Sequence, residues 1–246
     1  MIDKQQWIET FKDLKIEKGM LVIIDGFLHD WDQTINQATT FLDALLSVVS
    51  SEGTVVCFST NQFQIEPSQW DKDVDSKDYA RIRKGISQSN NPLPSSDPLV
   101  NTMLLRDDVI KKRHPLYTVL AIGKYARFIT RKIPLHFPNG KESPMQGCVD
   151  LKGYVLVLNE LSVDSYPFSH CLSNENTPVY ISGGLSVEHG VSFWQKFLHH
   201  KSDYQTLTQR FNTLIEKGKS KQKTLASNTL TLINSETIKE VTINEY

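Results

Sequence analysis

The chain has 246 residues, of which 39% are hydrophobic and 22% are charged, a composition typical of a globular protein rather than a disordered or fibrous one. Lysine plus arginine number 27 against 28 for aspartate plus glutamate, so the chain lacks the basic excess that binds nucleic-acid phosphates. No apolar run approaches the length of a membrane span, and the first residues do not resemble a signal peptide. Three widely spaced cysteines indicate free thiols rather than a disulfide framework. We therefore expect one domain over residues 1–246, in the cytoplasm, with neither nucleic acid nor membrane as a partner; homo-oligomerisation stays open.

The first part of the chain predicts a helix followed by a strand–helix–strand unit. Residues 5–14 carry apolar side chains at helical spacing. Residues 20–24 and 54–58 are short, continuous apolar runs, which are typical of buried strands. Between them, residues 34–50 place apolar side chains at steps of three and four, which predicts an amphipathic helix. Two strands joined by a helix form a βαβ unit with parallel strands and a right-handed crossover.

Residues 60–100 break this pattern. They are rich in Gln, Ser, Asn, Asp and Pro and have no periodicity, which predicts a long loop insertion of the kind that carries function. Beyond it we predict, in chain order, helices over 101–110 and 118–129, strands over 153–158 and 179–181, a helix over 205–216, and a hairpin of 229–233 and 238–243 around a turn at 234–236. The expected fold is α/β: a mixed, mainly parallel sheet flanked by helices, with a long loop insertion and a C-terminal β-hairpin.

Several motifs are absent or incomplete. The chain has no GxxxxGK phosphate loop and no GxGxxG after a strand. Asp71, Asp73 and Asp75 have the opening spacing of a calcium loop, but Ser76 and Ile82 stand where glycine and glutamate are required. We therefore predict a solvated loop at these aspartates and no metal site.

Four segments, taken in order and spacing, carry a resemblance to a known family. They are Ile23-Ile24-Asp25-Gly26-Phe27-Leu28, Glu52-Gly53-Thr54-Val55-Val56, His114-Pro115-Leu116-Tyr117-Thr118-Val119-Leu120-Ala121-Ile122-Gly123, and the combination of residues 140–144, the strand at 154–158 and His170. The third is the most specific, because it looks like His-Pro-x-x-Ser-x-x-Ala-x-Gly. Over roughly residues 19–175 the chain resembles the aminoglycoside 3-N-acetyltransferases, a family of CoA-dependent enzymes.

The chain also departs from the pattern of that family. Asp25, Phe27 and Thr118 replace a histidine and two serines, Asn159 stands where the third strand normally ends in glycine, and Pro167 and Ser173 replace the threonine and glutamate around His170. The residue that orients His170 therefore stays open, with Glu160, Asp164 and Glu175 as candidate carboxylates.

The resemblance implies N-acylation with acyl-CoA as co-substrate. An amine attacks a thioester only as the free base, so the reaction needs a proton acceptor, and histidine suits this near neutrality because its ordinary pKa is about 6.5. The resemblance assigns this role to His170. For His114, which precedes a proline, a structural hydrogen bond is an equally good interpretation.

The CoA thioester is expected to bind at the carboxyl end of the first strand. Its carbonyl develops an oxyanion, which needs hydrogen-bond donors already directed at it. Ligands of open α/β sheets bind at the carboxyl ends of strands, so we assign this role to the backbone N–H groups of Gly26, Phe27 and Leu28. Thr118, at the start of the predicted helix 118–129, is assigned to a CoA phosphate or the pantetheine amides.

The acceptor is expected to be an amino sugar. We assign Asp25 to its amine or hydroxyl, because a carboxylate buried without a partner is costly, Asn159 to a sugar hydroxyl, and Tyr117 to the wall of the substrate site. Acidic and basic side chains are mixed in the 60–100 loop, whereas binders of cationic aminoglycosides usually present many carboxylates. We therefore favour a nucleotide-linked, dTDP-type amino-deoxy sugar for surface polysaccharide synthesis.

Three alternatives stay open. The acceptor is an aminoglycoside antibiotic, or the chain is a non-catalytic module that binds CoA or a sugar, or His199 with Asp203 performs the transfer, as in another class of CoA-dependent acyltransferases. Against the last, Tyr204 replaces the glycine expected after the aspartate. The favoured interpretation places His199 and His200 at the C-terminal end of a helix, where cations are stabilised.

Overall fold

The computed structural model describes residues 2–28, 35–60, 65–69, 74–88, 97–172, 177–188, 190–200 and 203–243. Its helices are α1 (Lys4–Asp13), α2 (Ile35–Val49), α3 (Tyr79–Gln88), α4 (Pro98–Leu104), α5 (Ala126–Ile129), α6 (Pro144–Asp150), α7 (Tyr166–Leu172), α8 (Tyr204–Glu216) and α9 (Ser235–Ile243). Its strands are β1 (Leu21–Gly26), β2 (Thr54–Thr60), β3 (Ile110–Arg113), β4 (Tyr117–Gly123), β5 (Tyr154–Leu158), β6 (Val179–Glu188), β7 (Val191–His200), β8 (Lys221–Leu225) and β9 (Asn228–Asn234).

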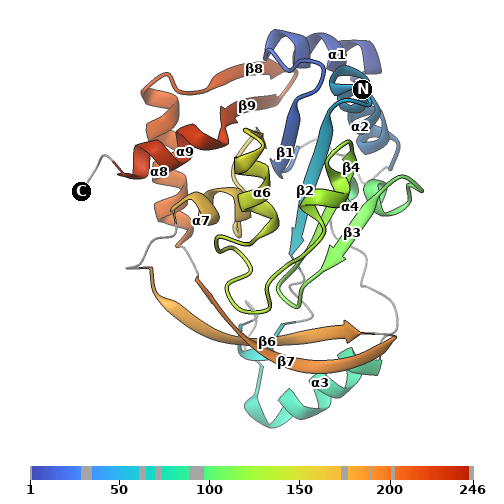
Figure 1. Ribbon diagram of the computed structural model, residues 1–246, viewed down its shortest axis with the longest axis vertical. Helices are drawn as coiled ribbons and strands as arrows, with labels where there is room; N and C mark the ends of the chain where they lie inside the picture. Colours follow the sequence, from blue (N-terminus) through green and yellow to red (C-terminus); the bar gives the residue numbers. More distant parts are fainter. Residues whose placement is uncertain are drawn as a thin grey trace.

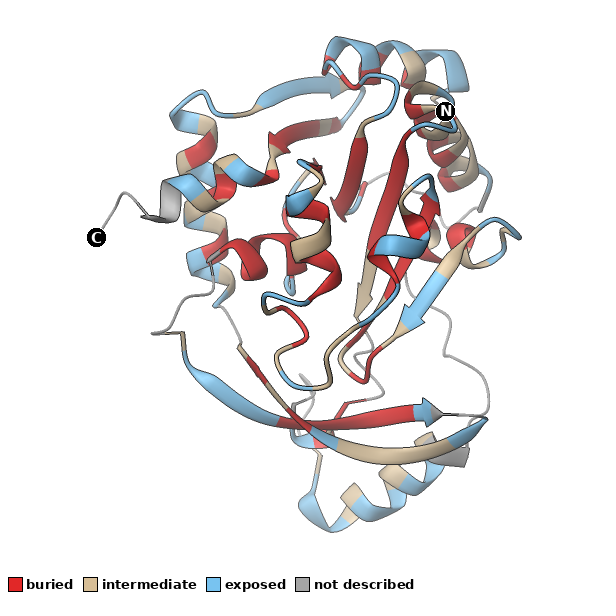
Figure 2. Ribbon diagram, viewed as in Figure 1, coloured by how far each residue is buried: buried red, intermediate tan, exposed pale blue. Residues whose placement is uncertain are grey.

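Seven strands form one sheet in the order β3-β4-β2-β1-β5-β9-β8 (Figure 1). The three central strands β2, β1 and β5 are parallel, and the outer strands pair antiparallel. β1 is buried at five of its six positions, as expected of a central strand covered on both faces (Figure 2). The predicted α/β class with a mixed sheet is confirmed, and the parallel pairs lie at its centre.

The two faces of the sheet bury separate hydrophobic clusters. On one face α1, α2 and α4 pack, and the rings of Trp7 and Phe11 meet the edge of Phe41 with centroids 5.0 and 5.3 Å away. On the other face α5 to α9 bury Tyr117 and Phe168, among others. Burying a side chain such as Phe168 stabilises the fold by about 1.5–3 kcal/mol. The second face also carries His170. Within the described ranges, no helix combines the length and apolar character needed to cross a bilayer.

β6 and β7 form a hairpin of their own beneath the main sheet (Figure 1). α3 packs against β7, where the Arg83 guanidinium lies 5.9 Å from the centre of the Trp194 ring and also pairs with Glu66. The Trp194 ring also packs against Gly183: an added Cβ there would lie 2.6 Å from the indole nitrogen, so a larger residue would force the ring to shift. The predicted strand at 179–181 is confirmed, but it is the start of a ten-residue strand.

The structure corrects four sequence predictions. His199 and His200 lie in β7 rather than at a helix end, because residues 191–200 pair with β6 along their whole length. Residues 118–123 belong to β4 and not to a helix, because they pair with β2 on one side and β3 on the other. Part of the 60–100 segment is helical, as α3. The helix predicted over 101–110 ends at Leu104, the last residue of α4, and Ile110 already begins β3.

The C-terminal hairpin exists, but β8 and β9 form it, and residues 238–243 lie in α9. The side chain of Asn234 accepts a hydrogen bond from the backbone N–H of Glu236 at 2.8 Å, so the predicted turn starts a helix instead.

Candidate active site

His170 lies in α7, with its ring between the loop before α6 and α6 itself. The side chain is 7% exposed. Its Nδ1 is 2.5 Å from the backbone oxygen of Asn139, and its Nε2 is 3.2 Å from Oε1 of Gln146. The hydroxyl of Ser143, which caps α6, is 3.5 Å from Nδ1. The Asn139 and Gln146 oxygens both only accept hydrogen bonds, so a neutral ring can donate to one of them at a time, and the contact at Nδ1 is the shorter.

Burial lowers the pKa of His170 to about 4, which keeps the ring neutral near pH 7. The hydrogen bond to Asn139 opposes this shift, as does the more distant carboxylate of Asp150, whereas the cation of Lys239 adds to it. A neutral imidazole has a nitrogen lone pair that can accept a proton, as a general base requires. Nδ1 thus contacts a backbone carbonyl rather than one of the candidate carboxylates. Of those candidates, Glu175 lies outside the described residues.

Asp25 is buried at the end of β1, where two serines of the β5–α7 loop hold its carboxylate. The hydroxyls of Ser162 and Ser165 donate to its two oxygens at 2.6 Å each. Burial raises the pKa of Asp25, and these two hydrogen bonds oppose the rise. Side chains of the protein therefore already bind the Asp25 carboxylate. The assignment of Asp25 to a substrate amine stays a prediction.

The adjacent residues at the end of β1 form close backbone contacts. The N–H of Gly26 donates to the Ser162 hydroxyl at 3.0 Å, and the N–H of Phe27 donates to the backbone oxygen of Leu158 at 3.2 Å. Gly26 has a φ of +78°, and an added Cβ would lie 2.1 Å from the backbone oxygen of Glu160. These two N–H groups already have protein acceptors, which does not fit the oxyanion role predicted for them. Leu28 is buried in the core, whereas the Phe27 ring is exposed.

Asn159 connects three strands. Its φ is +59°, a left-handed conformation that asparagine tolerates better than most residues. Its Nδ2 donates to the backbone oxygen of Phe27 at 3.1 Å and to Oδ1 of Asn228 at 3.0 Å, and its Oδ1 accepts from the N–H of Thr229 at 2.8 Å. The amide that was predicted to bind a sugar hydroxyl thus holds the ends of β1, β5 and β9 together.

The His-Pro segment supports the loop that contacts His170. His114 Nδ1 accepts from the N–H of Leu116, and Nε2 lies 3.0 Å from the backbone oxygen of Leu135. The hydroxyl of the fully buried Tyr117 donates to the backbone oxygen of Pro138 at 2.8 Å. Both contacts hold the 135–139 segment in place, which favours the structural interpretation of His114. Thr118 lies in β4, where it pairs with Ser59 of β2 and Arg113 of β3, so it does not begin a helix.

His199 and Asp203, the alternative catalytic pair, bind different partners in the structure. The carboxylate of Asp203 caps α8, accepting from the N–H of Thr206 at 2.9 Å. Nε2 of His199 instead lies 2.6 Å from the hydroxyl of Ser182, on the opposite strand of the hairpin.

Comparison with known proteins decides the family. The family model described as aminoglycoside 3-N-acetyltransferase matches residues 28–245. The chain belongs to the aminoglycoside 3-N-acetyltransferase family.

Individual relatives agree with this assignment. The SPbeta prophage-derived aminoglycoside N(3')-acetyltransferase-like protein YokD of Bacillus subtilis (strain 168) is 29% identical over 160 residues, which cover 63% of this chain and 59% of that protein. The crystal structure of YokD from Bacillus subtilis superposes with a TM-score of 0.85 at 22% identity, covering 98% of this chain and 97% of that one. The structure of AAC-IIIb in a binary complex with CoASH superposes with a TM-score of 0.78 at 13% identity, covering 98% and 95%. These structures share the fold of this chain.

The sequence did not predict three residues that lie around the His170 ring. Asn139, Gln146 and Lys239 lie in a loop, in α6 and in α9, and only the packing of α6, α7 and α9 brings them to His170. Asn139 alone had a local signal, because it lies between Pro138 and Gly140 in a turn-rich segment.

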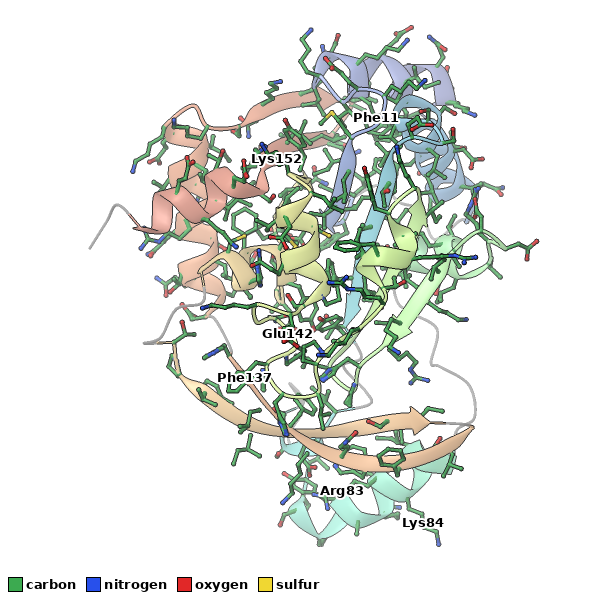
Figure 3. The ribbon with its side chains drawn as sticks, in the orientation of Figure 1. Phe11, Arg83, Lys84, Phe137, Glu142 and Lys152 are labelled. Carbon is green, nitrogen blue, oxygen red and sulfur yellow. The ribbon has the colours of Figure 1, made fainter. Side chains whose placement is uncertain are left out.

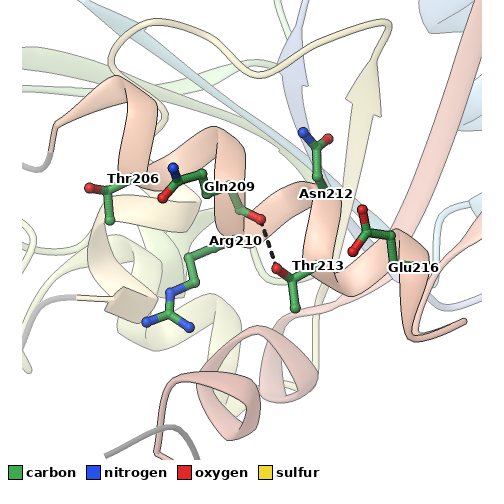
Figure 4. Close-up of a pocket in the computed structure, with 6 residues that line it drawn as sticks. All are labelled: Thr206, Gln209, Arg210, Asn212, Thr213 and Glu216. Atoms are coloured by element: carbon green, nitrogen blue, oxygen red, sulfur yellow. Dashed lines mark hydrogen bonds between the residues drawn. The ribbon is translucent and has the colours of Figure 1, made fainter.

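Two hollows on the surface do not involve the predicted site residues. One, of about 510 Å³, is lined by polar side chains of α8 including Arg210 and Glu216 (Figure 4). The other, of about 570 Å³, lies between α1 and α2. Within the described part of the chain, no three His, Cys, Asp or Glu side chains gather closely enough to hold a metal ion.

Proposed function

We propose that the protein transfers an acyl group from acyl-CoA to an amine of an aminoglycoside, with His170 as the general base. The observation that carries the proposal is an imidazole that burial keeps neutral and that contacts a backbone carbonyl through Nδ1, in a chain that belongs to the aminoglycoside 3-N-acetyltransferase family. The family match and the names of the relatives favour an aminoglycoside acceptor over the nucleotide-linked sugar that we had preferred from the sequence.

The proton transfer follows from the state of the ring. The acceptor amine forms a bond to the thioester carbon and loses a proton to Nε2 of His170; the carbon–sulfur bond breaks, and the departing sulfur takes that proton from the ring, so that CoA leaves as the thiol. Nε2 has to contact the amine for this, and the Gln146 amide is its present neighbour at 3.2 Å. An amine that approaches Nε2 therefore has to displace the Gln146 amide or bind beside it.

The side-chain oxygen of Asn139 is a candidate acceptor for an N–H group of a ligand. This oxygen is buried and has no hydrogen-bond partner among the residues that the structure describes, although the backbone oxygen of Asn139 contacts His170. Leaving a buried acceptor without a donor costs about 1–3 kcal/mol, so a ligand that brings an N–H group would relieve this cost. Both the acceptor amine and the amides of pantetheine carry such groups, and CoA supplies the activated acyl carbon.

The experiment combines acetyl-CoA with an aminoglycoside such as sisomicin, with a dTDP-amino sugar, or with no acceptor. We expect thiol release and acetylated product, detected by mass spectrometry, with the aminoglycoside. His170→Gln should lower kcat/KM by about 10²- to 10⁴-fold, the usual contribution of a general base. His199→Gln is the matched control and should keep activity.

Acylation of the dTDP-amino sugar alone would reject the aminoglycoside acceptor. A CoA-dependent rise in Tm without any acylated product would instead favour the non-catalytic alternative. Full activity in His170→Gln would reject the assigned base.

A further inference from the structure

Tyr117, which we predicted to line the substrate site, is fully buried, so its side chain has no surface that a substrate could contact. Its ring packs among aromatic neighbours, with its centroid 4.5 Å from that of Tyr166 and 5.5 Å from that of Phe58. Any part that Tyr117 plays in the reaction therefore has to act through other residues.

The Tyr117 hydroxyl binds the segment that contacts the imidazole. It donates to the backbone oxygen of Pro138 at 2.8 Å. The next carbonyl along the chain, that of Asn139, lies 2.5 Å from Nδ1 of His170. The oxygen that Tyr117 holds and the oxygen that contacts the imidazole thus belong to consecutive residues.

The Tyr117 ring also supports the helix that carries His170. Tyr166 lies four residues before His170 on α7, so the two side chains lie on the same side of that helix. The ring of Tyr166 is the one on which Tyr117 packs. Tyr117 therefore contacts both the helix that carries the imidazole and the segment opposite its Nδ1.

The 135–139 segment depends on contacts of this kind. Phe137 has a φ of +55°, a left-handed conformation that is costly for a residue with a Cβ. Its N–H donates to a backbone oxygen of β7 at 2.7 Å, and the His114 ring contacts the first carbonyl of the segment at 3.0 Å. Of these contacts and that of Tyr117, the one made by Tyr117 is closest in sequence to Asn139.

The position of the Asn139 carbonyl bears on proton transfer. For Nε2 to accept a proton from the acceptor amine, the ring proton of His170 has to be on Nδ1. An oxygen opposite Nδ1 stabilises the proton there, and the Asn139 carbonyl is placed to do so. Movement of this carbonyl would also turn Nε2 away from the substrate, and about 1 Å of misplacement can cost about 10²-fold in rate.

We propose that Tyr117 is a positioning residue for His170. Its hydroxyl fixes the backbone next to the carbonyl that contacts the imidazole, and its ring supports α7. The proposal rests on the proposed function in that His170 is the base, whereas the effect of Tyr117 on the His170 ring is a property of the free protein.

The test compares Tyr117→Phe with Tyr204→Phe. Each variant removes a hydroxyl that donates to a backbone oxygen, but that of Tyr204 binds Leu161, away from the 135–139 segment. We expect Tyr117→Phe to lower kcat by about 10-fold, less than a full 1 Å misplacement would, and to leave KM for acetyl-CoA close to the wild-type value. Tyr204→Phe should keep both constants.

A second measurement needs no substrate. In ¹⁵N-histidine-labelled protein the ring signals of His170, assigned by their loss in His170→Gln, should move in Tyr117→Phe and stay in place in Tyr204→Phe. Either a wild-type kcat or unmoved His170 signals in Tyr117→Phe would overturn the proposal. Equal changes in Tyr204→Phe would also overturn it, because they would show a general loss of stability.

His114→Gln replaces Tyr117→Phe if that variant does not fold. It removes the ring that contacts the other end of the segment, so it should lower kcat and move the His170 signals in the same way, and wild-type behaviour would overturn the proposal. Absence of turnover in the wild type would reject the proposed function alone, because the NMR comparison still decides the positioning role.

Discussion

Asn159 offers a direct test of whether a predicted substrate ligand is a structural residue. Its amide makes three hydrogen bonds, of which those with Asn228 and Thr229 are partly buried. Each such bond contributes about 1 kcal/mol net. Asn159→Gly removes them but keeps a residue that adopts the φ of +59° without strain, so we expect a loss of about 2 kcal/mol in the free energy of unfolding.

Asn159→Ala loses the same bonds and also forces alanine into the left-handed conformation. That conformation costs about 1–2 kcal/mol for a residue with a Cβ, so this variant should lose about 3 kcal/mol or more. Urea denaturation monitored by circular dichroism measures both values, and an unchanged m-value shows that the two-state transition is preserved.

The difference in the free energy of unfolding between the glycine and alanine variants measures the cost of placing a residue with a Cβ in the left-handed conformation. Equal stability of glycine and alanine variants would refute the strain argument. Wild-type stability of Asn159→Gly, with a raised KM for the acceptor, would refute the structural role and support the original assignment to a sugar hydroxyl.

Three further predictions concern stability. Gly26→Ala should abolish soluble expression or lower Tm by more than 10 °C, about 3–5 kcal/mol for a chain of this size, because its Cβ would overlap the Glu160 oxygen; a Tm close to wild type would contradict this contact. The pKa of His114, like that of His170, is lowered by burial to about 4, so the unfolded state binds more protons between pH 6.5 and 4, and stability should fall as the pH decreases through this window. Urea midpoints against pH test this, and His114→Gln should flatten the curve by up to about 3 kcal/mol; an equally steep curve would exclude His114 as a contributor. Burial raises the pKa of Asp97 to about 6, so its charged form destabilises the fold above that pH. Asp97→Asn keeps an N-cap for α4 and should raise Tm at pH 8 but not at pH 4. Equal changes in Tm at the two pH values would contradict the argument.

The strands and helices that local pattern specifies were predicted within a few residues. β1, α2 and β2 bury continuous or periodic apolar residues, so each one carries its own signal along the chain. β4 carries no such signal, because its apolar run suits either a helix or a buried strand. Its pairing with β2 and β3 decided the matter. Of the β6–β7 hairpin the sequence predicted only the start of β6, because Gly183 and Gly184 interrupt the apolar pattern of that strand.

The site divides in the same way. Family resemblance led to His170, and the loop that ends in Asn139 could be anticipated as a turn. The contacts of Gln146 and Lys239 could not, because Gln146 is 24 residues from His170 and Lys239 is 93 residues from Gln146, and no periodic pattern links residues so far apart. Asp25 and Asn159 stood out correctly as unusual polar residues at strand ends, but the sequence could not show that other parts of the chain bind them. Figure 3 shows how densely such side chains fill the space between the elements, with Phe137 next to the β6–β7 hairpin.

The amino-acid order by itself determined the class of fold, the central βαβ unit and the family, because these depend on local hydrophobic periodicity and on short motifs. Only the tertiary structure decided which polar groups satisfy one another and which groups contact the two ring nitrogens of His170. Hydrogen bonds and charges act over a few ångströms in space, and the packing of distant helices, rather than their order along the chain, sets those distances.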